Sequence, residues 1–167
     1  MGKEMSRRSF LKAGTAAAIG LSMTPGNVFA NVDQKKKKKN AKDAKLKILG
    51  VGIGGRGASV LRGLETEDFI GLCDVDWKYA DPIFKRYPNA KKYNDYKVMF
   101  AEMLDQADAV VVATADHTHA IIAAEAIAAG KHVYCEKPLT HSVYESRLLT
   151  KLAAKHKVAT QMGNQGA

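Results

Sequence analysis

The feature that most constrains the fold of this chain is a glycine-dense turn between a short apolar run and a helix-like segment. Residues 46–57 read Leu-Lys-Ile-Leu-Gly-Val-Gly-Ile-Gly-Gly-Arg-Gly, and a helical pattern follows from Ala58. The turn has the spacing G-x-G-x-x-G at Gly52, Gly54 and Gly57. The first glycine allows a sharp turn off the strand, the second a close approach of backbone to a pyrophosphate, and the third close packing of the helix. Strand, turn and helix together predict a dinucleotide site, with the phosphates at the helix N-terminus.

An acidic residue stands where the ribose of a dinucleotide needs one. Residues 69–73 have the pattern of a second strand, and Asp74 follows them, 20 residues after Gly54. A carboxylate at this place accepts hydrogen bonds from the ribose hydroxyls and repels a 2′-phosphate. The sequence therefore predicts NAD as the cofactor and makes NADP the less favourable ligand.

The first 30 residues have the form of an export signal. Arg7 and Arg8 stand in the run Ser-Arg-Arg-Ser-Phe-Leu-Lys, which is typical of twin-arginine signals. The mildly apolar residues 13–23 that follow are too short to span a bilayer as a permanent helix. We therefore expect residues 1–30 to be a twin-arginine signal peptide, no stable membrane anchor, and a periplasmic or secreted location. A chance arginine pair on an ordinary N-terminal anchor is the alternative.

Residues 31–45 form a second segment outside the predicted fold. They include five consecutive lysines at positions 35–39, and like charges at this density repel one another and bury no core. We expect a lysine-rich disordered linker that acts as a solvated tether, although it could also touch anionic lipid or polysaccharide. Residues 46–167 contain 15 Lys and Arg against 14 Asp and Glu, whereas the whole chain has a net charge of +9. The predicted folded part is nearly neutral, which argues against a nucleic-acid-binding protein.

Strand and helix patterns alternate regularly after residue 45. The expected strands are residues 46–51, 69–73, 92–93, 107–113, 132–135 and 158–162, and the expected helices are 58–64, 77–87, 98–104, 118–129 and 142–156. Pro82 is expected in the first turn of its helix, and Gly130 ends the alanine-rich one. This alternation predicts an α/β fold with a Rossmann-type, doubly wound parallel sheet that binds its ligand at the C-terminal ends of the strands.

The cysteine and histidine spacings favour neither a disulfide nor a metal site. Cys73 and Cys135 each stand at the end of a predicted buried strand, and we interpret both as small buried apolar residues. His117 and His119 are two residues apart without an evident third ligand. No metal site is predicted.

Five motifs together give the chain a family resemblance. They are Gly-Ile-Gly-Gly-Arg-Gly at 52–57, Cys-Asp-Val-Asp at 73–76, Ala-Thr-Ala-Asp-His-Thr-His at 113–119, Gly-Lys-His-Val-Tyr-Cys-Glu-Lys-Pro at 130–138, and Met-Gly-Asn-Gln-Gly at 162–166. With these motifs, residues 46–167 resemble the N-terminal NAD(P)-binding domain of the Gfo/Idh/MocA family, which includes glucose-fructose oxidoreductase and inositol dehydrogenase. With the export signal, the chain is most similar to secreted bacterial members that act on sugars. Ala115 stands where relatives often have proline.

The resemblance implies a role for each matching residue. The residues implied to bind the cofactor are Gly52, Gly54, Gly55, Arg56, Gly57, Asp74, Thr114, His117 and Glu136. Among these, residues 54–57 would contact the pyrophosphate, Asp74 the ribose, and Glu136 the neighbourhood of the nicotinamide. Lys137 would be the catalytic residue that faces the reacting carbon, and Pro138 would follow a cis peptide bond. A surface ion pair between Glu136 and Lys137 is the plainer alternative.

Family members also carry a second α/β domain, which supplies most of the substrate pocket, the oligomerisation surface and the usual base. No such domain follows in this sequence, so we interpret the chain as a fragment of a longer two-domain protein and do not expect it to oligomerise. The predicted function is the NAD-binding half of an exported oxidoreductase that acts on a CH–OH group of a sugar or polyol. The alternatives are the cofactor domain of an NAD-dependent glycosidase and a non-catalytic exported protein that binds a nucleotide or a sugar.

Overall fold

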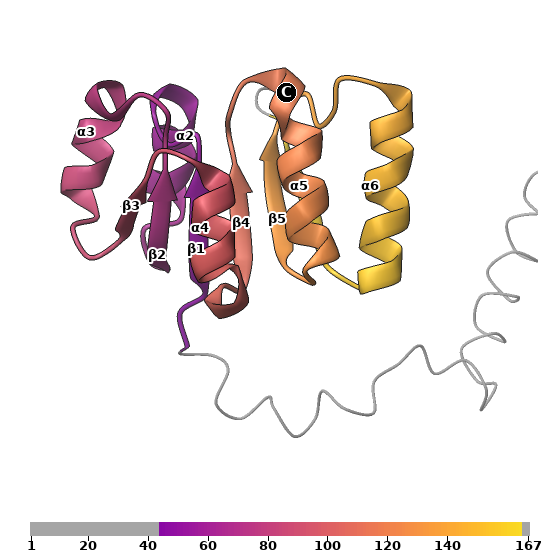
Figure 1. Ribbon diagram of the computed structural model, residues 1–167, viewed down its shortest axis with the longest axis horizontal. Coiled ribbons are helices and arrows are strands. Elements are labelled where there is room, and N and C mark those ends of the chain that lie inside the picture. Colours follow the sequence, from indigo (N-terminus) through magenta and orange to yellow (C-terminus); the bar gives the residue numbers. More distant parts are fainter. Residues whose placement is uncertain (1–43, 165–167) are drawn as a thin grey trace, which may run out of the picture. The chain divides into compact units, whose positions relative to one another are not determined.

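The computed structural model describes residues 44–164. The predicted signal peptide and most of the predicted linker lie outside the described residues. Six strands form one parallel sheet in the order β3-β2-β1-β4-β5-β6 (Figure 1). The strands are β1 (Lys47–Val51), β2 (Asp68–Cys73), β3 (Lys91–Tyr93), β4 (Ala109–Val112), β5 (His132–Glu136) and β6 (Thr160–Gly163). This is the strand order of dinucleotide-binding Rossmann folds, and it confirms the predicted fold class.

Five α-helices cover the two faces of the sheet. They are α2 (Gly55–Gly63), α3 (Trp77–Arg86), α4 (Tyr96–Met103), α5 (His119–Ala128) and α6 (Val143–His156), with short 3-10 turns at Leu104–Gln106 and Asp116–Thr118. One hydrophobic core contains side chains of α2 and α3, and the other contains side chains of α4, α5 and α6. The sheet residues between them alternate, so that Val111 belongs to the first core and Val110 and Val112 to the second. The described part is therefore a three-layer α/β sandwich.

Element boundaries differ from the sequence-based expectation in three informative places. The helix α2 begins at Gly55, three residues before the expected start at Ala58. The apolar pattern did not reveal these three residues, because they are two glycines and an arginine. Pro82 is not in the first turn of α3: Asp76 caps the helix and accepts the Tyr79 N–H, which places Pro82 at the sixth helical position. The strand β6 begins at Thr160 instead of residue 158. Lys157, the C-cap of α6, has the left-handed conformation with φ of 55°, and the residues after it turn the chain into the strand.

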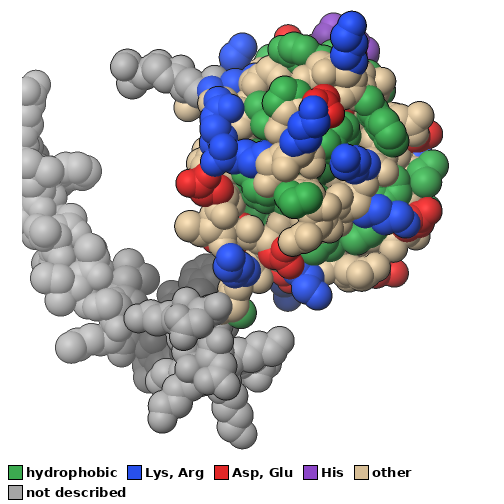
Figure 2. Space-filling model, turned by 90° about the vertical axis from the view of Figure 1, so that its left-hand side faces the viewer, with side chains coloured by type: hydrophobic (Ala, Val, Ile, Leu, Met, Phe, Trp, Pro, Cys, Tyr) green, Lys and Arg blue, Asp and Glu red, His purple; other side chains and the backbone are tan. Residues whose placement is uncertain are grey.

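The surface of the described part mixes charges of both signs. Figure 2 shows Lys and Arg side chains interspersed with Asp and Glu and with patches of hydrophobic atoms on one face. Within residues 44–164, we find no helix that combines the length and the apolar character needed to cross a bilayer.

Candidate cofactor site

The glycine turn after β1 has two positions, Gly52 and Gly57, at which neighbouring backbone leaves no room for a Cβ atom. Gly52 has φ of +75°, and a Cβ atom there would lie 2.7 Å from the backbone of Ala113 and Thr114. A Cβ atom on Gly57 would lie 1.9 Å from the carbonyl oxygen of Gly52. The start of α2 therefore packs directly on the end of β1, as the spacing of the motif predicts.

Asp74 lies immediately after β2 and faces the glycine turn. Its Oδ2 atom accepts the Gly54 N–H at 2.8 Å, and its Oδ1 atom accepts the Asp76 N–H at 3.0 Å. The backbone N–H of Asp74 itself donates to the Tyr93 carbonyl oxygen at 3.1 Å. These bonds hold the half-buried carboxylate beside the turn, at the place where the sequence predicts a ribose contact.

A cavity of about 660 Å³ opens along these residues. Among others, the residues that line it are Gly52 and Gly54 after β1, Asp74 after β2, Thr114 after β4, and Tyr79 of α3. The cavity thus lies at the C-terminal ends of β1 and β4, where the strand order reverses and ligands bind in open α/β sheets. Its volume is in the usual range for sites of small molecules and cofactors.

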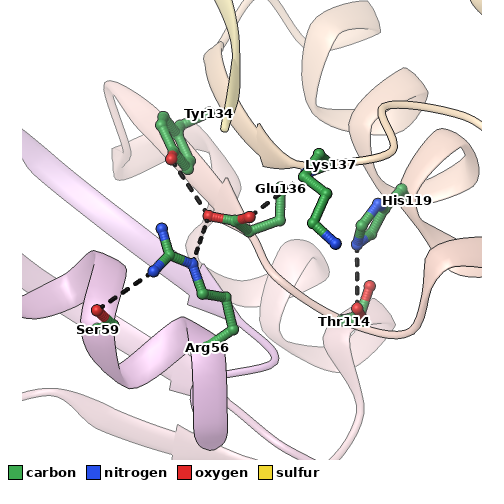
Figure 3. Close-up of polar contacts among 7 residues, drawn as sticks. All are labelled: Arg56, Ser59, Thr114, His119, Tyr134, Glu136 and Lys137. Atoms are coloured by element: carbon green, nitrogen blue, oxygen red, sulfur yellow. Dashed lines mark hydrogen bonds and ion pairs between the residues drawn. The ribbon is translucent and has the colours of Figure 1, made fainter. Parts of the chain in front are cut away.

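Arg56 and Glu136 form an ion pair beyond the glycine turn. The Arg56 Nε atom lies 3.0 Å from Glu136 Oε1, and the Tyr134 hydroxyl donates to the same oxygen at 3.2 Å. Figure 3 shows both contacts. The Glu136 side chain is 5% exposed and that of Arg56 47%. The carboxylate is therefore buried and paired with Arg56 of α2, which links the start of this helix to the end of β5.

Lys137 follows β5 on the exposed side of the same edge, and its bond to Pro138 is cis, as the resemblance predicts. Its side chain extends toward the side on which Thr114 and His119 lie (Figure 3). The His119 side chain is buried, with its Nδ1 atom 2.7 Å from the Pro138 carbonyl oxygen and its Nε2 atom 3.0 Å from the Thr114 carbonyl oxygen. His119 therefore connects the loop after β4 to the turn that carries Lys137.

Sequence reasoning selected His117 and missed His119 and Tyr79. His117 is exposed and does not line the cavity, although it lies in the 3-10 turn beside it. His119 is the first residue of α5 and lies on the apolar side of that helix. Its burial could have been predicted from the helical spacing of the alanines and isoleucines that follow it. Nothing in the sequence around Tyr79 indicates its place, because its contact with the glycine turn joins two separate elements.

The two cysteines are buried, as predicted, and their thiols are free. Burial raises the pKa of Cys73 to about 12, and the nearby carboxylates of Asp74 and Asp95 add to this. Burial raises the pKa of Cys135 to about 12 as well, with a further contribution from Glu136. Neither thiol is a nucleophile at neutral pH, since the thiolate is the reactive form. Within residues 44–164, no group of three or more His, Cys, Asp or Glu side chains is arranged to hold a metal ion.

Comparison with known proteins agrees with this geometry. Residues 45–164 match the Gfo/Idh/MocA family, described as an oxidoreductase family with an NAD-binding Rossmann fold. The chain belongs to this family. Its described part is the NAD-binding Rossmann domain characteristic of the family, which confirms the family resemblance found in the sequence.

Three curated relatives show the range of activities in the family. Glucose-6-phosphate 3-dehydrogenase of Bacillus subtilis is 27% identical over 120 residues, which cover 71% of this chain and 33% of the relative. Inositol 2-dehydrogenase of Acidothermus cellulolyticus is 36% identical over 103 residues, 59% of this chain and 30% of the relative. An alpha-N-acetylgalactosaminidase of Shewanella oneidensis is 26% identical over 159 residues, 83% of this chain and 35% of the relative. The chain thus spans about a third of the length of these relatives.

A solved structure supports the same assignment. GenD2 from gentamicin A biosynthesis, crystallised in complex with NAD, matches with a TM-score of 0.63 and 32% identity. The match covers 72% of this chain and 34% of that protein. The family domain and its NAD-bound structural relative agree with the cofactor predicted from the glycine turn and Asp74.

Proposed function

We propose that this chain supplies the NAD-binding half of an exported oxidoreductase that acts on a CH–OH group of a sugar or polyol. The observation that carries the proposal is the Asp74 carboxylate, which hydrogen bonds to the glycine turn within a cavity of cofactor size. The dehydrogenase relatives named for glucose 6-phosphate and inositol support the sugar or polyol class.

The residues at the cavity fit NAD by their chemistry. The N-cap of α2 is Gly54, which has no side chain to cap the helix, so backbone N–H groups at this end are suited to a pyrophosphate. The Asp74 carboxylate is suited to the ribose hydroxyls. When bound, NAD supplies the hydride acceptor for oxidation of the substrate carbon.

The far end of the site is suited to the substrate. The cation of Lys137 can donate hydrogen bonds to a sugar hydroxyl and stabilise negative charge that develops on its oxygen. Arg56 and Glu136, through their ion pair, fix the end of β5 from which Lys137 extends. The contact of His119 with the Pro138 carbonyl oxygen holds the turn that contains the cis Lys137–Pro138 bond.

Titration of the full chain with NAD and with NADP tests this proposal. We expect tighter binding of NAD, because the charge of Asp74 repels a 2′-phosphate. The substitution Asp74→Ala should weaken NAD binding by about tenfold or more, the value of a hydrogen bond to a charged group, and should narrow the gap between the cofactors. Asp74→Asn is the control that keeps the size of the side chain and removes its charge. Equal or tighter binding of NADP by the unmodified chain would contradict the assignment.

The second candidate is the cofactor domain of an NAD-dependent glycosidase. The similarity to the Shewanella oneidensis alpha-N-acetylgalactosaminidase, which covers 83% of this chain, favours it. Product analysis of the whole enzyme separates the two candidates. A dehydrogenase accumulates one NADH for each oxidised substrate, whereas a glycosidase that oxidises and then re-reduces its sugar releases the sugar without net NADH.

Export by the twin-arginine route is a separate part of the proposal. It is supported by the Arg7–Arg8 pair and by the suitability of this route for folded, cofactor-loaded proteins. Replacing both residues by lysine keeps the charge and should retain the protein in the cytoplasm, measured by cell fractionation against a cytoplasmic marker. Normal export of the double variant would indicate the general secretory pathway instead.

A further inference from the structure

The aromatic ring of Tyr79 lies against the glycine turn, next to Asp74. A Cβ atom built on Gly54 would lie 2.4 Å from Tyr79 Cδ1 and 3.4 Å from Asp74 Oδ2. A Cβ atom on Gly55 would lie 2.7 Å from the Tyr79 hydroxyl oxygen. The ring and the carboxylate therefore converge on the same short piece of backbone, and both line the cavity.

Hydrogen bonds from backbone N–H groups to two carboxylates fix this arrangement. The Tyr79 N–H donates to Asp76 Oδ1 at 2.9 Å, the Asp76 N–H donates to Asp74 Oδ1 at 3.0 Å, and the Gly54 N–H donates to Asp74 Oδ2 at 2.8 Å. The first turn of α3 is thus tied through two carboxylates to the turn after β1. These bonds position the backbone of Tyr79 beside the glycine turn, although the residue is 63% exposed.

We propose that Tyr79 is a further residue that determines cofactor choice, by filling the space beside Asp74 that a 2′-phosphate would need. This inference rests on the proposed binding of NAD. A 2′-phosphate adds a bulky dianionic group to the ribose hydroxyl that Asp74 is suited to hold. The ring of Tyr79 excludes that group by its volume, and Asp74 excludes it by its charge.

Arg56, the cation in the glycine turn, does not offset this exclusion of a 2′-phosphate. Arg56 could in principle pair with a 2′-phosphate, as arginines in such sites do. Its Nε atom instead faces Glu136 at 3.0 Å, on the side of β5 (Figure 3). The volume of the Tyr79 ring, the charge of Asp74 and the orientation of Arg56 all disfavour NADP.

The test compares NAD and NADP affinities of the full chain by calorimetry for the unmodified protein and for Tyr79→Ala, Tyr79→Phe and Asp74→Ala/Tyr79→Ala. We expect Tyr79→Ala to narrow the preference for NAD by about tenfold, the size of discrimination that shape gives in a protein pocket. Tyr79→Phe keeps the ring and should leave the preference unchanged. The double variant should narrow it further than either single change. Tyr144→Ala, which removes another exposed tyrosine, 75% exposed and on α6, is the control.

The outcomes separate this inference from the proposed function. An unchanged preference in Tyr79→Ala, or an equal effect of Tyr79→Phe, would overturn the role of ring volume while leaving NAD binding intact. If the unmodified chain bound neither cofactor, the proposed function would fail and this inference with it. Thermal unfolding of each variant shows that a change in affinity does not come from loss of the fold.

Discussion

At the scale of single residues, the site depends on where a side chain is absent. Gly57 faces the carbonyl oxygen of Gly52, and the 1.9 Å that a Cβ atom would leave is far below any normal contact. The obstacle is backbone on both sides, so neither partner can rotate away. The close packing of α2 on β1, and with it the position of the helix end proposed to bind the phosphates, depends on this glycine.

Two substitutions in the same helix test this point. Gly57→Ala should destabilise the protein by about 3 kcal/mol, the upper end of the usual cost of overpacking, and should weaken NAD binding. Gly63→Ala is the matched control, because a Cβ atom there meets nothing within 4 Å. It should be neutral or stabilising by about 0.5–1 kcal/mol. Urea unfolding measures the change in the free energy of unfolding for both substitutions. A change for Gly57→Ala no larger than that for Gly63→Ala would show that the turn can relax.

At the scale of elements, α6 begins with a complete capping box just after the turn that carries Lys137. The Ser142 Oγ atom accepts the Glu145 N–H at 3.3 Å, and Glu145 Oε2 accepts the N–H groups of Ser142 and His141 at 2.9 and 2.8 Å. This cap fixes the point at which the chain enters α6. It thereby limits the freedom of residues 137–141 between β5 and the helix.

Removal of this cap has a predictable cost. Ser142→Ala should lower the free energy of unfolding by about 1 kcal/mol, because one N–H group at the start of α6 loses its partner. Ser142→Thr keeps an accepting oxygen and should lose less. Chemical unfolding monitored by circular dichroism measures the difference, and equal effects of the two substitutions would show that the hydroxyl does not cap the helix.

At the scale of the whole molecule, the described domain brings the predicted site residues together at the C-terminal ends of its strands. The sheet gathers the glycine turn, Asp74, Thr114 and Lys137 at one edge, because parallel strands all end on the same side. The curated relatives extend over about three times the matched length. Oxidation of an alcohol also needs a base for the hydroxyl proton, a contribution of roughly 10²–10⁴-fold.

We therefore expect residues 31–167 to bind NAD without measurable turnover of any sugar. Supplying the second domain that the family resemblance implies, fused or as a separate chain, should give activity, measured as NADH formation or sugar release. Lys137→Ala should then abolish most of it, whereas Lys151→Ala, an exposed lysine on α6, should not. Robust turnover by residues 31–167 alone would place the catalytic groups within this domain.

The sequence by itself determined the fold class and the order of strands and helices along the chain, and it predicted the place of the cofactor site. It could do so because glycine spacing, apolar runs and the acid after β2 are local signals whose meaning does not depend on distant contacts. Helix starts were less predictable where polar or glycine residues interrupt the pattern, as at Gly55, and where a cap sets the register, as at Asp76.

Only the tertiary structure decided the partners of the charged and aromatic groups. Arg56 and Glu136 are 80 residues apart in sequence, and their ion pair forms because the start of α2 and the end of β5 lie at the same edge of the sheet. The contact of Tyr79 with the glycine turn and the burial of His119 against Pro138 arise in the same way. Such pairings depend on which strands are neighbours in space, and the crossover that makes β1 adjacent to β4 is a property of the folded sheet.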